Sequence, residues 1–79
     1  MTNERRKEVS QLVVLAQQLM NKVDEILIAE QQDFDSWSEG KQDGRAGEDS
    51  TMAQDALEEA SSSIASAIDS LCLAENKAY

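Results

Sequence analysis

The sequence contains no histidine, no proline and a single cysteine, Cys72. Without histidine or a cysteine cluster, a structural zinc site has no usable ligand set, and an internal disulfide cannot form. No nucleophile is paired with a histidine base, and no glycine-rich phosphate loop follows a strand. We therefore expect no enzyme activity, no metal and no cofactor. Cys72 is expected to be a small, half-buried hydrophobic residue.

Long apolar runs are absent as well. No segment approaches the roughly 20 apolar residues that span a bilayer, so we expect a soluble, cytoplasmic protein with no membrane contact. A chain of 79 residues is near the lower limit for a self-sufficient core. Because disulfides and metals are excluded, homo-oligomerisation, most simply as a dimer, is the remaining way to complete that core.

One long amphipathic segment organises the chain. Its apolar residues recur at intervals of three, four and seven, which predicts a helix over about residues 3–37 with one broad apolar stripe. The first row of the stripe is Val9, Leu12, Ala16, Leu19, Val23 and Ile26, and the second is Val13, Met20, Leu27 and Phe34. Val14, Leu15 and Ile28 lie outside the stripe, which indicates contacts beyond a single pair of helices.

The middle of the chain changes character. Residues 38–50 contain all three glycines and alternating charges with no apolar period, which predicts a connecting loop. Thr51 and Gln54 have the spacing of a capping box, so a second helix is expected over about 51–75, followed by a short tail at 76–79. Its predicted contact row is Ala53, Leu57, Ala60, Ile64, Ala67, Leu71 and Ala74.

The two patterns predict an all-α, antiparallel two-helix hairpin that forms one domain. Folding the chain back about residue 42 places Val9, Ala16 and Val23 beside the alanine row, where small side chains allow close approach. Two helices alone leave much of both stripes exposed to water. A dimer that forms a four-helix bundle is the simplest closure.

Acidic residues are concentrated near the expected loop. Between positions 24 and 59, twelve acidic residues stand against Lys41 and Arg45, a net charge of −10, whereas the rest of the chain is close to neutral. Such an end attracts basic surfaces of partner proteins and disfavours direct nucleic-acid binding. Its alternative role is to keep a small protein soluble. The candidate partner-binding residues are Trp37, Glu39, Asp43, Glu48 and Asp49. Trp37 has an alternative role too, as a cap on the open end of the bundle.

Three cations, Arg5, Arg6 and Lys7, occupy the first turn of the first helix. Positive charge there opposes the helix dipole, so it requires another explanation. One is compensation by Asp69 and Glu75, which an antiparallel fold brings alongside. The other is an anionic ligand, because amide groups at a helix N-terminus already favour anions.

Two resemblances bear on function. Trp37-Ser38-Glu39-Gly40 at the turn resembles the WXG family of secreted four-helix-bundle dimers, with the glycine one position later. The basic start at 3–7, the Glu30–Asp35 helix end and the segments 56–60 and 68–71 resemble small acidic hairpin proteins of bacteriophages. That resemblance implies binding to a host or defence protein.

Three functions follow as expectations. The first is a small phage-type binding protein that inhibits or modulates a host protein through its acidic surface. The second is a protein that sequesters a small phosphorylated ligand at its basic turn. The third is a structural, WXG-like helical bundle.

Overall fold

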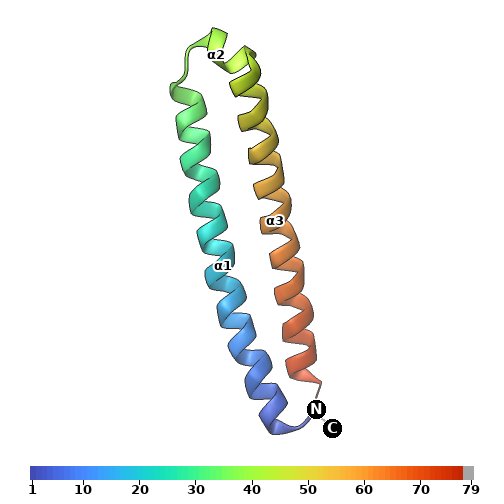
Figure 1. Cartoon of the computed structure of the whole chain (residues 1–79). Helices are drawn as coiled ribbons and strands as arrows, with labels where there is room; N and C mark the ends of the chain where they lie inside the picture. Colours follow the sequence, from blue (N-terminus) through green and yellow to red (C-terminus); the bar gives the residue numbers. More distant parts are fainter. Residues whose placement is uncertain (78–79) are drawn as a thin grey trace.

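The structure, a computed structural model that describes residues 1–77, is a hairpin of two long helices (Figure 1). Helix α1 spans Asn3–Ser36, the short helix α2 spans Glu39–Asp43, and α3 spans Arg45–Asn76. The long helices run antiparallel, with α2 at one end and the N-terminus and the end of α3 at the other. The molecule measures 60 × 14 × 12 Å. The predicted all-α hairpin is confirmed, and the four-helix bundle stays a prediction.

Helix α1 is continuous because no glycine or proline occurs between its ends. Thr2 caps it, and its hydroxyl oxygen accepts a 3.3 Å hydrogen bond from the backbone N–H of Arg5. At the C-terminal end of α1, the Phe34 carbonyl has no partner within the helix and accepts two other hydrogen bonds. One comes from the backbone N–H of Trp37 at 3.1 Å and one from the side-chain amide of Gln42 at 2.8 Å.

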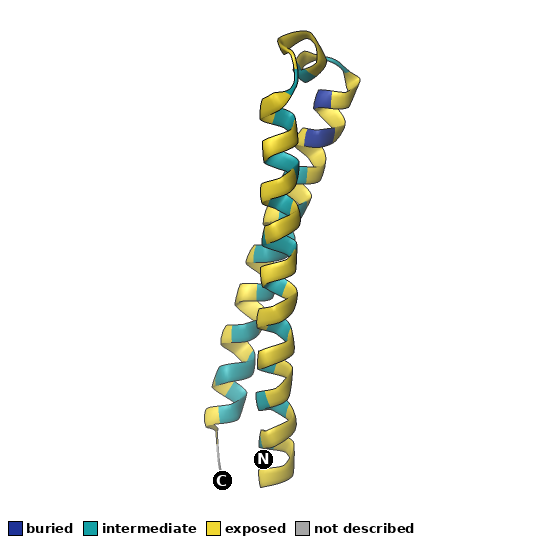
Figure 2. Ribbon diagram, turned by 90° about the vertical axis from the view of Figure 1, so that its left-hand side faces the viewer, coloured by how far each residue is buried: buried dark blue, intermediate teal, exposed yellow. Residues whose placement is uncertain are grey.

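The two long helices meet along one row of half-buried residues, which we call the seam (Figure 2). Its members alternate three and four places apart on both helices, the spacing of a coiled coil. On α1 the seam is Val9, Val13, Ala16, Met20, Val23, Leu27, Glu30 and Phe34. On α3 it is Gly47, Ser50, Gln54, Leu57, Ser61, Ile64, Ile68, Leu71 and Glu75.

The seam corrects both predicted contact rows. On α1, Leu12, Leu19 and Ile26 are exposed, so the single broad stripe splits into a seam row and an open row. On α3, Ala53 and Ala67 are exposed, and Ala60 and Ala74 are only half-buried at the margin. The alanine row is one position, or 100° around the axis, away from the seam. The side chains opposite α1 are instead Ser61, Ile68 and Glu75, beside the correctly predicted Leu57, Ile64 and Leu71.

Side-chain hydrogen bonds across the seam give a register close to the predicted fold at residue 42, since the pair Ser50–Glu30 is centred at residue 40 and two other pairs lie slightly further along. Ser10 donates to the carboxylate of Glu75, and Ser61 donates to Oδ1 of Asp24 at 2.7 Å. Both pairs are centred between residues 42 and 43. A hairpin that folds back about residue 42 has this register.

The predicted loop at 38–50 is wrong, because most of it is helical. Ser38 caps α2 by accepting a 3.4 Å bond from the N–H of Lys41, and Gly44 is the extended residue between α2 and α3. Helix α3 therefore begins at Arg45, six residues before the predicted start. Thr51 is not a cap, because its hydroxyl donates to the carbonyl of Gly47 within the helix at 2.9 Å.

Close contact between α2 and α3 explains this difference. Gly47 is buried, and a Cβ atom placed on it would lie 1.7 Å from the carbonyl oxygen of Gln42. Glycine is therefore required at 47 for packing, not for a loop conformation. Ser50, 3% exposed, extends the seam one turn further toward α2. Tertiary contacts outweigh the low helix propensity of this segment.

No apolar side chain among residues 1–77 is fully buried. The apolar side chains of the seam are half-buried, because a two-helix hairpin has no third layer to cover them. The fold thus leaves its core open on at least one side.

Candidate interaction surfaces

Four large apolar residues of α1 outside the seam are exposed along one side. Leu12, Leu15, Leu19 and Ile26 have exposed fractions of 49, 59, 54 and 58%. Leu12, Leu19 and Ile26 each precede a seam residue by one position and repeat every seven residues. They form a second apolar row at about 100° from the first. A helix with two such rows fits a bundle in which it packs against two neighbours.

Helix α3 contributes a matching row of small residues. Its members also precede seam residues by one position: Ala53, Ala56, Ala60, Ala67 and Ala74. Both helices are right-handed and run in opposite directions, so rows that precede the seam lie on the same side of the pair. We call this side the open face: the four large residues of α1 beside the five alanines of α3.

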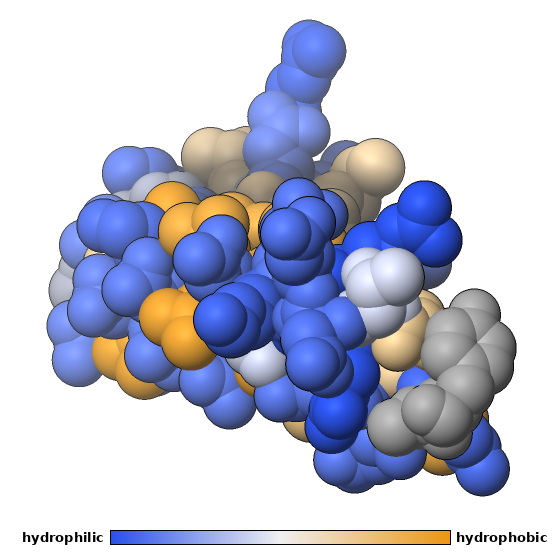
Figure 3. All heavy atoms as spheres, turned by 90° about the horizontal axis from the view of Figure 1, so that it is seen from below, coloured by the Kyte–Doolittle hydropathy of each residue, from blue (hydrophilic) through white to orange (hydrophobic). Residues whose placement is uncertain are grey.

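The opposite side of the hairpin is mainly polar, although Val14 and Ile28 are exposed there as well, at 52 and 53%. There the residues that follow seam positions include Ser10, Asp24 and Thr51, and the bonds from Ser10 to Glu75 and from Ser61 to Asp24 bridge the helices. One side is therefore closed by hydrogen bonds, and the other is left apolar. Seen along the hairpin from the termini, hydrophobic side chains reach the surface among hydrophilic ones (Figure 3).

The acidic end of the hairpin carries four of the five predicted partner-binding residues. Glu39 and Asp43 lie on α2, Glu48 and Asp49 lie in the first turns of α3, and all four carboxylates are exposed. The structure brings them together at one end of the molecule. They form an exposed, charged surface that is open to a partner.

Trp37, the fifth residue, ends α1 and is half-buried. Its ring lies 5.8 Å from that of Phe34, tilted by 52°, and Lys41 Nζ lies 4.0 Å from its ring centre. Such an aromatic pair and cation–π contact hold the ring against the turn. This geometry agrees with the predicted role of a cap on the end of the hairpin.

The three cations of the first turn take different positions. Arg6 is half-buried, and its Nε donates a 3.0 Å hydrogen bond to the backbone carbonyl of Glu75. It therefore caps the C-terminal end of α3, whose last turn has no cation of its own. Glu75 is alongside as predicted, but Arg6 contacts its backbone carbonyl while the Glu75 carboxylate accepts from Ser10, and Asp69 is exposed. Arg5 and Lys7 are exposed as well.

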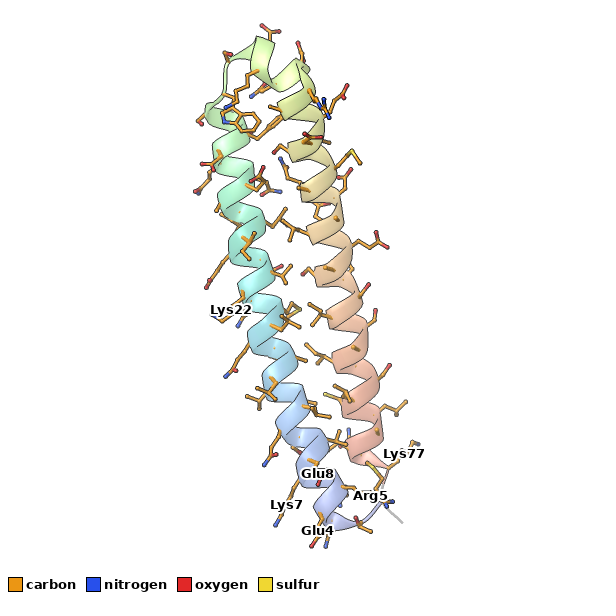
Figure 4. The ribbon with its side chains drawn as sticks, viewed as in Figure 1. Glu4, Arg5, Lys7, Glu8, Lys22 and Lys77 are labelled. Atoms are coloured by element: carbon orange, nitrogen blue, oxygen red, sulfur yellow. The ribbon has the colours of Figure 1, made fainter. Side chains whose placement is uncertain are left out.

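A shallow, open hollow of about 320 Å³ lies beside this turn, lined by Asn3, Arg6, Lys7 and Ser10. Partial removal from water, followed by the charges of Arg6 and Arg5, lowers the pKa of the Met1 amino group below its ordinary 8.0. Arg5 and Arg6 thus place positive charge beside the Met1 amino group, although the acidic Glu4 and Glu8 lie at the same end (Figure 4). Figure 4 shows Arg5, Lys7 and Lys77 near the termini, with Lys22 alone midway along α1.

Among residues 1–77, no three His, Cys, Asp or Glu side chains are grouped to hold a metal ion. Within the same range, no helix is both long and apolar enough to span a membrane. Cys72 is a half-buried free thiol.

Sequence reasoning identified the charged ends but missed the open face as a unit. The signal that could have revealed it is a second seven-residue row one position before the first, present on both helices. No protein-family model, curated protein or solved structure showed a significant match to this chain.

Proposed function

We propose that this chain is a non-enzymatic binding protein that associates with itself into a four-helix bundle and presents its acidic end to a basic partner protein. One observation carries the self-association. Within residues 1–77 the hairpin has no buried apolar side chain and keeps an apolar open face, which a second pair of helices would cover.

The acidic end supports the second half of the proposal. Its exposed carboxylates lie around a rigid turn, so their charges are held in place rather than spread along a flexible loop. Fixed negative charge steers a basic surface into contact and favours that surface over acidic ones. A host or defence protein, the kind of partner that the resemblance to small phage proteins implies, fits this role.

Sedimentation equilibrium at micromolar concentration tests the self-association, and a folded species with the mass of one chain would reject it. The partner site is tested by capture from a bacterial lysate with wild-type protein and with Glu39, Asp43, Glu48 and Asp49 all changed to Lys. We expect the quadruple variant to lose the captured protein while its helix content is retained. A matched control reverses the exposed Asp55, Glu58 and Glu59 on α3, away from the turn.

Anion binding at the basic turn is a second candidate function, favoured by the hollow beside Arg6 and Lys7. Because Arg6 also caps α3, its replacement would confuse binding with stability. Lys7→Gln is the cleaner variant, and Arg5→Gln, at an exposed residue that does not line the hollow, is its control. Calorimetric titration with inorganic phosphate and with a nucleotide should show weaker binding for Lys7→Gln alone. Equal binding by all three proteins would reject this site.

A further inference from the structure

The large residues of the open face are arranged symmetrically along α1. Leu12 and Ile26 lie seven residues to either side of Leu19, and all three are about half exposed. A two-fold axis at Leu19, perpendicular to α1, would place Leu12 against Ile26 of a second copy and Leu19 against its own equivalent. The apolar row is thus complementary to itself when the second helix runs in the opposite direction, and charge selects this direction over the parallel one.

We propose that the open face binds a second copy of this chain with its turn pointing the opposite way, α1 against α1 and α3 against α3, about a two-fold axis at Leu19. This inference rests on the proposed self-association and adds its orientation, its contact residues and its symmetry.

Charge supports this orientation. Asp33 and Arg5 are both exposed, and each lies fourteen residues from Leu19, on opposite sides. The proposed axis therefore brings Asp33 of one copy beside Arg5 of the other. On a larger scale, it separates the two acidic ends, each within a segment of net charge −10. The alternative dimer, with both turns at the same end, places these segments side by side, where like charges repel.

The small residues of α3 suit the same arrangement. Besides the alanines, the outer margin of the open face on α3 carries Ser63 and Ser70, so no large side chain separates one α3 from the other. Two such helices can approach to the short end of the usual 8–10 Å between axes. The leucine row then fills the wider space between the two α1 helices.

The exposed area of the chain is also consistent with a missing partner. A compact monomer of 8.7 kDa is expected to expose about 4,700 Å². This hairpin exposes 5825 Å², an excess of roughly 1,100 Å². A stable interface buries about 800 Å² on each partner, so the excess is of the size that one such interface removes.

Spin-label distances test the orientation. In a Cys72→Ser background, Gln18→Cys and Gln32→Cys each carry one nitroxide at an exposed position of α1. Gln18 lies beside the proposed axis, so its two labels should be within about 25 Å, given neighbouring axes 8–10 Å apart. Gln32 is thirteen residues from the axis, so its labels should be about 40 Å apart at 1.5 Å per residue.

The outcomes separate this inference from the proposed function. Short distances at both positions would overturn the opposed orientation and leave the dimer intact. Absence of dipolar coupling at both positions, with a single-chain mass in sedimentation, would overturn self-association itself.

A charge exchange tests the contact without labels. Asp33→Arg and Arg5→Asp should each weaken association about two- to fivefold, as expected for an exposed pair, and the double variant should restore it. Arg5→Asp improves the N-terminal charge of α1, so weaker association with unchanged or higher helix content separates lost pairing from lost folding. Additive losses in the double variant would reject the pairing.

Discussion

The backbone of Gly47 packs directly on the backbone of Gln42, with room for a hydrogen atom and not for a methyl group. A Cβ atom at Gly47 would lie 1.7 Å from the Gln42 carbonyl oxygen and 2.4 Å from its carbonyl carbon. Both neighbours are backbone atoms, so no side-chain rotation can relieve the overlap. This single contact sets how α2 folds onto the first turn of α3.

Gly47→Ala should therefore destabilise the protein by about 1–3 kcal/mol, the usual cost of overpacking, although alanine is the better helix former. Gly40→Ala is the matched control, because no atom lies within 4 Å of its Cβ position in α2. That control should be neutral or more stable by up to about 1 kcal/mol. Urea unfolding of both variants measures the difference, and equal midpoints would contradict the contact.

Arg6→Gln should lower stability by about 0.3–1 kcal/mol, because a charge-bearing donor is lost from the C-terminal end of α3. The neighbouring Arg5→Gln removes the same charge at an exposed position and should have little effect. Thermal unfolding followed by circular dichroism compares the two. A larger loss of stability for Arg5→Gln than for Arg6→Gln would show that the stabilisation comes from positive charge near the termini and not from the hydrogen bond between Arg6 and Glu75.

Glu30 and Ser50 form a polar pair within the seam. The Ser50 hydroxyl donates to Glu30 Oε1 at 2.7 Å and accepts from the Gln54 amide at 3.2 Å, and Ser50 is 3% exposed. Glu30→Leu alone should cost about 1–3 kcal/mol, because the buried hydroxyl loses its acceptor. Adding Ser50→Ala should recover most of that loss, since both partners are then apolar. A double-mutant cycle in urea measures the coupling energy, and additive effects would contradict the pair.

Ala67→Leu tests the open face. Ala67 is exposed in the hairpin, beside the seam and on the open face. In the proposed dimer a leucine there would separate the two α3 helices, at a cost of about 1–3 kcal/mol in association. Ala65→Leu, exposed on the polar side, should leave association unchanged. Sedimentation equilibrium measures the dissociation constant of each dimer. An Ala67→Leu dimer with the same dissociation constant as wild type would reject close contact between the two α3 helices.

Much of the fold could be predicted from local patterns. The continuous α1 and the antiparallel arrangement follow from an unbroken helical period and from two patterns of similar length. The segment 38–50 could not be predicted in this way. Its glycines resemble those of a loop in sequence, but Gly47 is required by the approach of Gln42, a contact that exists only after the turn has folded.

The candidate sites, too, could be predicted only in part from the sequence. The acidic end and the basic turn are visible as runs of charge, and the structure adds which groups already have partners. Arg6 contacts a carbonyl of α3, and Trp37 packs on Phe34 and Lys41. Contacts between residues as far apart in the chain as 6 and 75 form only when the two helices pack together, so no local sequence pattern predicts them.

Two long helices, their antiparallel direction and their approximate register could be predicted without the structure, because each follows from the helical period and from the similar length of the two apolar patterns. Which rows face each other depends on contacts between residues far apart in the chain, so the folded structure was needed to identify them. The rows at 12, 19, 26 and at 13, 20, 27 are both apolar and one position apart, so hydrophobicity alone cannot choose between them. The structure places the second row in the seam, where Ser61 and Ser50 can donate to Asp24 and Glu30. A seam built on the alanine row would turn those hydroxyls away and leave Glu30 without them. The row of leucines, isoleucine and alanines that remains outside is the surface that another pair of helices can cover.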